Sequence, residues 1–512
     1  MSAVIPITGV DLGFRVPGGY AEIIFNQGPS TASAGTREVL FVMPMLSTGT
    51  YTANTLYSVR NAGQAEAGGG AGSPLHRAIR KFMAVNKNAK VWAVAVAETS
   101  GGSPAAATGT VTFTTAPTGV GTATVTVCGE DASYTFSSAD TVTTIAAGLV
   151  AAINAKTWLP VVATNSSGVL TLTAKLKGIS QGTASLGVIR FRAVITAGVG
   201  TTVAVSGAFL GTGVAGAEGS TTEAANLVTA LATVDSVRKY FIVSSANDAT
   251  SLGNLKTHIV NKSLPLQGLR SVAITAYTGS LSSCQTLAIG KNYERLAMTL
   301  QVNSEHDCAE LAGAWAGLRQ MGEQVDSAKN FDGSSLDPHI LPAFNVADWP
   351  DGNDQNDAIN DGITIIASNN SGAYVVMSVD TRSKSSTGTV DDFRSTETHR
   401  VSVCDEFTDE LLIRWDLGYK GQKLKDDQRL ADGSVNPNQK LIRGVLTPSQ
   451  LVSPIKKQMN DYELVGKLQN TEQTKQSVTV IKTGSRLESG FDLNVIDHAH
   501  QATFRIAEIS TG

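Results

Sequence analysis

The sequence predicts a multidomain protein of the α/β plus α+β class, with a doubly wound, mostly parallel sheet domain at its centre. The chain has 512 residues, more than one small domain needs. Strand-like and helix-like segments alternate on either side of a long interruption, as they do in parallel sheets. Charge density also changes: residues 101–220 contain nine charged side chains, whereas residues 391–512 contain 34. We therefore expect a β-rich α+β insertion within the sheet domain and a separate α+β region at the C-terminus.

The sheet domain begins with a strand, a helix and a second strand. Residues 38–46 form a continuous apolar run with the length of a buried strand. Ser73 followed by Pro74 is typical of an N-cap and a first helical turn, so a helix is expected over 73–86. The apolar run 90–98 predicts the next strand. The alternation of helix and strand resumes after residue 220.

The low-charge interruption has a pattern of its own. Segments 109–117 and 121–130 alternate apolar and small polar residues, as half-buried strands do. A helix over 138–155 is predicted by apolar residues spaced three or four apart. Residues 158–178 predict a hairpin that turns at Asn165–Gly168.

The C-terminal region combines a hairpin, charged helices and strand-like runs. The hairpin is expected at 363–380, and helices are expected at 399–420 and 447–466. Three mixed-polarity strands are expected at 476–484, 489–497 and 500–510, and an extended strand at 16–29. The predicted segments are an N-terminal arm and linker at 1–36, a discontinuous sheet domain at 37–100 with 217–356, a surface-exposed insertion at 101–216, and a C-terminal α+β domain with a terminal strand arm at 357–512.

Composition argues against several classes of protein. The net charge is −4, and nucleic-acid or anionic-membrane surfaces usually need a basic excess. Residues 193–217 are the one stretch that resembles a membrane span, but its glycines and β-branched residues favour strand and turn. The four cysteines have no short-range spacing, so we expect reduced, buried thiols. The start of the chain lacks a basic segment followed by an apolar run, which a secretory signal would need.

Two motifs match enzyme signatures in their letters but not in their setting. GTGVAG at 211–216 fits a dinucleotide fingerprint, yet Glu218 would place an acid where phosphate should bind. GISQG at 178–182 fits a nucleophile elbow, but loop and strand follow Ser180 instead of a helix. We expect a linker at the first motif, a loop at the second, and no catalytic residue at either.

Metal binding has two weak candidates. His498 and His500 would share one face of a strand beside Asp497, but the sequence marks no further ligand. The acidic segment 348–362 lacks the residue order of a calcium loop and predicts a solvated polar loop. We therefore expect no metal site and no cofactor.

Several segments resemble contractile tail sheath proteins of the Mu-like bacteriophage type. The opening VPGGYAEIIFNQGP is similar to the arm of that family, and GGGAGSPLHRAIRKFMAVNKNAKVWAVAVAE at 68–98 is similar to its most characteristic turn, helix and strand. Lys87 departs from the pattern, which usually has Pro there. The C-terminal part, from RVSVCDEFTDELLIRWDLGYK onward, resembles the family in layout.

The resemblance implies a non-enzymatic subunit of a helical or stacked-ring sheath that surrounds a tail tube and contracts to drive the tube through the bacterial envelope. It also implies self-assembly in the host cytoplasm, a place in the virion tail, and tail tube, baseplate and tail terminator proteins as partners, without membrane insertion or direct nucleic-acid binding. The alternatives are the sheath of a tail-derived bacteriocin or secretion-type injection system, another assembling protein such as a surface-layer subunit, and a nucleotide-dependent enzyme on the α/β domain.

Unpaired terminal strands suggest how copies would join. An isolated strand leaves backbone N–H and C=O groups without partners, which strand addition to a neighbour satisfies. The residues that we expect to pair between subunits are Tyr20, Ile23, Phe25, Phe491, Leu493, Val495, Phe504 and Ile506.

Overall fold

The computed structural model describes two compact units of the chain. The described residues are 36–98, 105–177, 189–196, 200–207, 219–383 and 397–500. Unit 1 comprises residues 406–458 and 475–492, and unit 2 comprises the other described residues. The four segments expected from the sequence remain a prediction. The two motifs GTGVAG (211–216) and GISQG (178–182) lie outside the described residues, so the linker and the loop expected there remain predictions.

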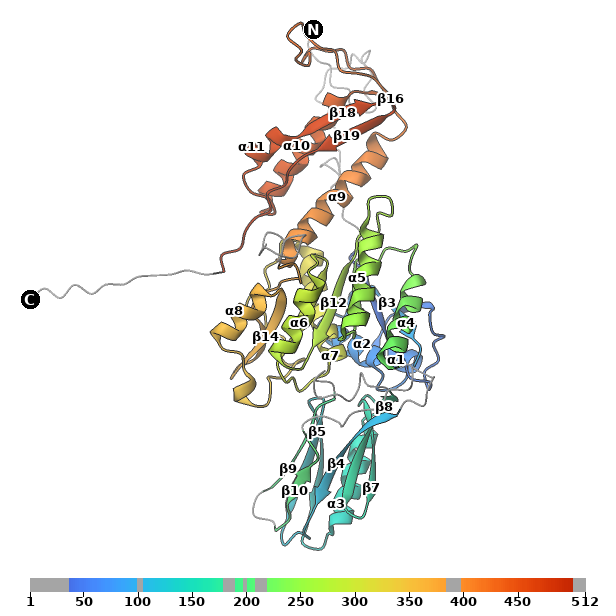
Figure 1. The fold of residues 1–512 in the computed structure, drawn as a ribbon, viewed down its shortest axis with the longest axis vertical. Coiled ribbons are helices and arrows are strands. Elements are labelled where there is room, and N and C mark those ends of the chain that lie inside the picture. The colour runs from blue at the N-terminus through green and yellow to red at the C-terminus, as the bar shows by residue number, and fades with distance from the viewer. Residues whose placement is uncertain are drawn as a thin grey trace, which may run out of the picture. The chain divides into compact units, whose positions relative to one another are not determined.

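Unit 2 is built around a mixed sheet, of which β3, β12 and β14 are labelled in Figure 1. Its eight strands lie in the order β15-β14-β13-β12-β11-β1-β3-β2. Neighbours from β14 to β3 are parallel, and the two edge strands, β15 and β2, are antiparallel to theirs. The strands are β1 (Val39–Pro44), β2 (Leu56–Val59), β3 (Val91–Val96), β11 (Phe241–Ser244), β12 (Val272–Tyr277), β13 (Leu296–Leu300), β14 (Ile363–Asn369) and β15 (Gly372–Val375).

Helices cover both faces of this sheet, because successive side chains of a strand point to opposite faces. Phe41 packs in one core with α2 (Pro74–Val85) and α7 (Cys308–Val325). Leu40 packs in another with α4 (Gly219–Ala232) and α5 (Ala249–Ser263). Helices α6 (Leu281–Lys291) and α8 (Gly352–Asn360) contribute to a third core at β12–β14, and the short α1 (Ala62–Gly69) precedes α2. The expected mixed α/β architecture with a large sheet is confirmed.

The described residues between 106 and 205 form two small sheets and a helix around a separate hydrophobic core. The sheet orders are β10-β4-β8-β7 and β6-β5-β9. Helix α3 (Val142–Ala155) starts at a capping box formed by Thr141 and Thr144, and its apolar face lies in this core. The strands are β4 (Ala106–Phe113), β5 (Gly121–Val127), β6 (Glu130–Phe136), β7 (Val161–Ser166), β8 (Val169–Lys177), β9 (Phe191–Ile195) and β10 (Val203–Val205).

The C-terminal part contains the expected helices and one ribbon of two antiparallel strands. Helix α9 spans Thr398–Gly418, and α10 spans Pro448–Leu464. The remaining elements are α11 (Thr471–Thr474), the two-residue strands β16 (Lys423–Leu424) and β17 (Val445–Leu446), and the ribbon of β18 (Thr479–Thr483) and β19 (Arg486–Gly490). Across the described residues, no helix is both long and apolar enough to span a membrane.

Three expectations about these elements differ from the structure. The strand expected at 489–497 is wrong, because β19 ends at Gly490 and only Val495 forms an isolated bridge, to Leu468. The acidic segment 348–362 is not a loop throughout, because Asp351 caps α8 and forms a capping box with Asp354. The hairpin β14–β15 exists as expected, but β14 pairs with β13 and so extends the large sheet.

Candidate functional site

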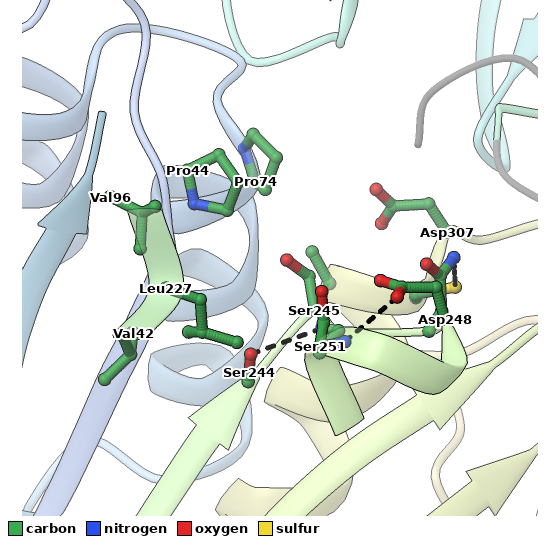
Figure 2. A pocket seen from close by; sticks show the side chains of 14 residues that line it. Val42, Pro44, Pro74, Val96, Leu227, Ser244, Ser245, Asp248, Ser251 and Asp307 are labelled. Atoms are coloured by element: carbon green, nitrogen blue, oxygen red, sulfur yellow. Dashed lines mark hydrogen bonds between the residues drawn. The ribbon is translucent and has the colours of Figure 1, made fainter. Parts of the chain in front are cut away.

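The crevice at the carboxyl end of the large sheet is where ligands bind in many α/β proteins. Strand order reverses at β1, which has β3 on one side and β11 on the other, and such reversal points commonly hold ligands. Figure 2 shows the cavity there, among Pro44, Val96, Ser244 and Asp248. Its volume is only about 60 Å³, against about 300–1,000 Å³ for ligand pockets. The cavity can hold water but not a nucleotide.

An internal carboxylate occupies the place in this crevice where an anion would bind. Asp248 is the N-cap of α5, and its Oδ1 accepts from the backbone N–H groups of Thr250 and Ser251, both at 2.9 Å. Figure 2 shows the bond from Ser251. A helix N-terminus attracts phosphate through these same donors. The geometry therefore does not favour the nucleotide-dependent alternative at this crevice.

A buried charge cluster joins α2 to the first turn of α7. Arg77 is 1% exposed and forms an ion pair with Asp307, the N-cap of α7. His306 Nδ1 lies 2.7 Å from Glu310 Oε2, and His306 Nε2 accepts from the backbone of Leu341 at 3.1 Å. Burial opposes ionisation of Glu310, yet Lys81, His306 and Arg77 together hold its pKa well below the usual value. Because these groups pair with one another within the chain, we interpret the cluster as structural: it holds α2 against the first turn of α7.

Ion pairs also fasten residues 106–205 to the rest of unit 2. Glu305 Oε1 lies 3.1 Å from Arg190 Nε, and Glu305 Oε2 lies 3.3 Å from Arg192 Nε. A third pair joins Glu130 to Arg80 of α2 at 3.3 Å. Each of the two regions has its own hydrophobic core, and the two cores share no residue.

The surface of unit 1 carries apolar side chains that the described chain leaves exposed. Leu417 is 80% exposed, Leu441 66% and Ile481, on β18, 61%. Unit 1 also has a groove of about 230 Å³, whose walls include Trp415 of α9 and Leu487 of β19. Contiguous exposed apolar surface commonly marks a protein–protein contact. We call β18, β19 and this groove the ribbon surface.

The residues expected to pair between subunits have mixed outcomes. Tyr20, Ile23, Phe25, Phe504 and Ile506 lie outside the described residues. Phe491 packs against Phe407 with ring centroids 5.7 Å apart. Val495 is buried and bridges Leu468, and Leu493 lies between them outside any strand. Pairing with another copy therefore stays a prediction for all eight.

His498 and His500 lie beside an acid that the sequence did not single out. Their partner is Glu397, the residue just before α9. Asp497, the expected neighbour, instead pairs with Arg400 and accepts from Gln469. Short-range spacing marks only the two histidines, because the fold brings Glu397 to them from about 100 positions earlier in the chain.

A sequence relative now supplies the context for these features. No protein-family model matches the chain. The Mu-like prophage FluMu tail sheath protein of Haemophilus influenzae is 30% identical to it over 174 residues. The chain is similar to a Mu-like tail sheath protein. The resemblance expected from the sequence is thereby confirmed, over 34% of this chain and 35% of that sheath protein. The match thus spans about a third of the relative's length.

Solved structures with weaker similarity include further sheath proteins. The sheath tail protein of Desulfitobacterium hafniense has 13% identity and a TM-score of 0.46, covering 93% of this chain and 99% of that one. The sheath tail protein Lin1278 of Listeria innocua has 13% identity and a TM-score of 0.43, covering 91% and 98%. A chain of the anti-feeding prophage baseplate has 10% identity and a TM-score of 0.46, covering 97% and 100%.

Proposed function

We propose that this chain is a subunit of a contractile tail sheath. Copies of the chain assemble as a helical cylinder or stacked rings around a tail tube, and contraction drives the tube through the bacterial envelope. The observation that carries this proposal is the 30% identity to a Mu-like prophage tail sheath protein. The partners in this proposal are further copies of the chain, the tail tube protein, and the baseplate and tail terminator proteins. The particle is assembled in the host cytoplasm and becomes part of the virion.

The ribbon surface supports strand addition as the way in which copies join. Within the described residues, β18 and β19 pair only with each other, so each strand has one edge without a ladder partner. A two-stranded hairpin alone is marginally stable in water. An arm from another copy, around Tyr20–Phe25 or Phe504–Ile506, would satisfy an open edge through main-chain bonds. At about 0.5–1.5 kcal/mol net per hydrogen bond, four to six bonds give roughly a few kcal/mol per link.

Negative-stain microscopy of the purified full-length chain tests the proposal. We expect tubes or rings. A variant without residues 1–27, and another cut after His500, should keep a native circular dichroism spectrum and form neither. The second cut leaves β19 in place, which is essential because β19 is the only partner of β18 among the described residues.

A matched pair of point variants distinguishes a specific effect at the ribbon surface from a general effect of added surface charge. Ile481→Glu changes a β18 residue that is 61% exposed, and Val120→Glu changes a residue in the insertion that is 74% exposed. Tubes from V120E but not from I481E are expected. A full-length protein that stays monomeric at high concentration, with native circular dichroism, would contradict the sheath proposal.

A further inference from the structure

Three histidines converge on one carboxylate oxygen in unit 2. Glu397 Oε2 lies 3.2 Å from His500 Nε2, 3.3 Å from His399 Nδ1 and 3.8 Å from His498 Nδ1. The ligand atoms of Glu397, His498 and His500 all lie within 4.8 Å of one another. The rings of His399 and His498 also lie close together, with centroids 4.1 Å apart and planes tilted by 43°. Imidazole and carboxylate groups at such spacing are a donor set that divalent transition metals prefer.

The outer nitrogen of each histidine is held by a hydrogen-bond acceptor. His399 Nε2 lies 3.0 Å from the carbonyl oxygen of Ile496, and His498 Nε2 lies 2.9 Å from that of Ala328. His500 Nδ1 hydrogen-bonds the carboxylate of Asp332. Because carbonyl and carboxylate oxygens only accept, each outer nitrogen donates its hydrogen. Metal-binding histidines are oriented in the same way by partners behind them.

This arrangement directs lone pairs into the centre of the cluster. In a neutral imidazole whose outer nitrogen donates, the inner nitrogen carries a lone pair. With both rings neutral, the inner nitrogens of His498 and His500 face the Glu397 oxygen with no donor among them. A cation between them would turn this repulsion into coordination. Arg400 lies on the other side of Glu397, 3.4 Å from Oε1, and pairs with Asp497, so it leaves Oε2 to the histidines.

The spacing fits zinc. Zinc binds imidazole nitrogen and carboxylate oxygen at about 2.0–2.1 Å, which places the ligand atoms of a tetrahedron about 3.3 Å apart. Within the set of Glu397, His498 and His500, the distance from Glu397 Oε2 to His500 Nε2 is within about 0.1 Å of this value, and the distance to His498 Nδ1 is about 0.5 Å longer. We propose that Glu397, His498 and His500 form a structural site for a divalent transition ion such as Zn²⁺, with His399 packed beside them.

The place of the four residues along the chain indicates a structural role for the site. Glu397 and His399 precede unit 1 in the chain, and His498 and His500 follow it. A bound ion would close this long loop and fix the chain immediately before residue 501. Closing a long loop restricts the unfolded chain and so stabilises the folded one.

Metal titration of the tag-free full-length protein tests this inference. After removal of metal with a chelator, Zn²⁺ is titrated by calorimetry and Co²⁺ by visible absorption, which reports coordination geometry. We expect one ion per chain and tetrahedral cobalt bands. His498→Ala and His500→Ala should each weaken binding at least 100-fold. Asp332→Asn, which changes only the partner behind His500, should weaken it roughly 10–100-fold.

His258→Ala is the matched control, because His258 Nδ1 lies 3.6 Å from Asp235, away from the cluster. This variant should bind as the unchanged protein does, and Zn²⁺ should raise the Tm of both but not that of H498A. Circular dichroism of the metal-free variants checks that they fold. No stoichiometric binding, or equal binding by a folded H498A/H500A double variant, would overturn the proposal. Because no step here depends on tube formation, the result is independent of the sheath proposal.

Discussion

At the scale of single residues, His76 shows how the start of α2 depends on a neutral side chain. His76 is 2% exposed, and its Nδ1 accepts from the backbone N–H of Gly72 at 3.1 Å. Its own backbone N–H donates to Ser73 Oγ, the N-cap of the helix. Burial lowers the pKa of His76 to about 4, against a smaller upward effect of Glu66. The folded protein therefore resists protonation at this position.

The resulting pH dependence can be measured with one substitution. Because the folded pKa lies below the unfolded value, stability from His76 is complete above pH 6.5 and is lost as the pH falls toward 4. Between pH 7 and pH 5 the loss should be about 2 kcal/mol. His76→Gln keeps an acceptor but cannot titrate, so urea unfolding of H76Q should lose less stability over this interval. Equal losses in both proteins would contradict the assignment.

At the scale of elements, α2 and α7 pack closely at a position where α7 has a glycine and therefore no side chain. A Cβ on Gly313 of α7 would lie 2.2 Å from the carbonyl oxygen of Ala78 in α2. Contact at that distance would push the helices apart and disturb the core that contains Phe82 and Trp315. Backbone approach this close needs glycine.

Gly313→Ala should therefore destabilise the protein by about 1–3 kcal/mol, the usual cost of overpacking. Gly290→Ala in α6 is the control, because a Cβ there meets nothing within 4 Å. That change should be neutral or stabilise by up to about 1 kcal/mol, since alanine favours helix. Urea unfolding of the two variants gives the comparison, and similar effects of both would argue against close packing at Gly313.

Local patterns were sufficient for elements with a strong apolar period or a clear cap. The helix over 73–86 follows from Ser73 and Pro74, and the structure places α2 at Pro74–Val85. β19 was misplaced because its residues are mostly exposed, so it lacks an alternating apolar pattern. It is defined instead by the turn at Gly484, which has a φ of +63°, and by pairing with β18.

Only two members of the histidine cluster could be recognised from the sequence, for a different reason. His498 and His500 stand two positions apart, but Glu397, His399 and Asp332 reach them through tertiary structure. The acids nearest in sequence are poor guides, since Asp497 is engaged by Arg400. Sites assembled from distant segments need the fold before their members can be recognised.

At the scale of the whole molecule, the insertion should be dispensable for assembly. Its core shares no residue with the core of the large sheet, and its contacts with the rest of unit 2 include the pairs of Glu305 with Arg190 and Arg192. Deletion would expose Glu305 to water, which hydrates a carboxylate well. Joining Thr99 to Ser220 by a short linker should leave a folded chain that still forms tubes in negative stain. A folded deletion variant without tubes would count against this prediction.

The central claim is that copies of this chain are joined by strand addition at the ribbon surface. A cryo-electron microscopy reconstruction of the assembled tubes tests it most directly. We predict a strand from another copy on the free edge of β18 or β19, with side-chain density that matches Tyr20–Phe25 or Phe504–Ile506. A reconstruction in which both free edges face solvent, or are covered by something other than a strand, would contradict the account.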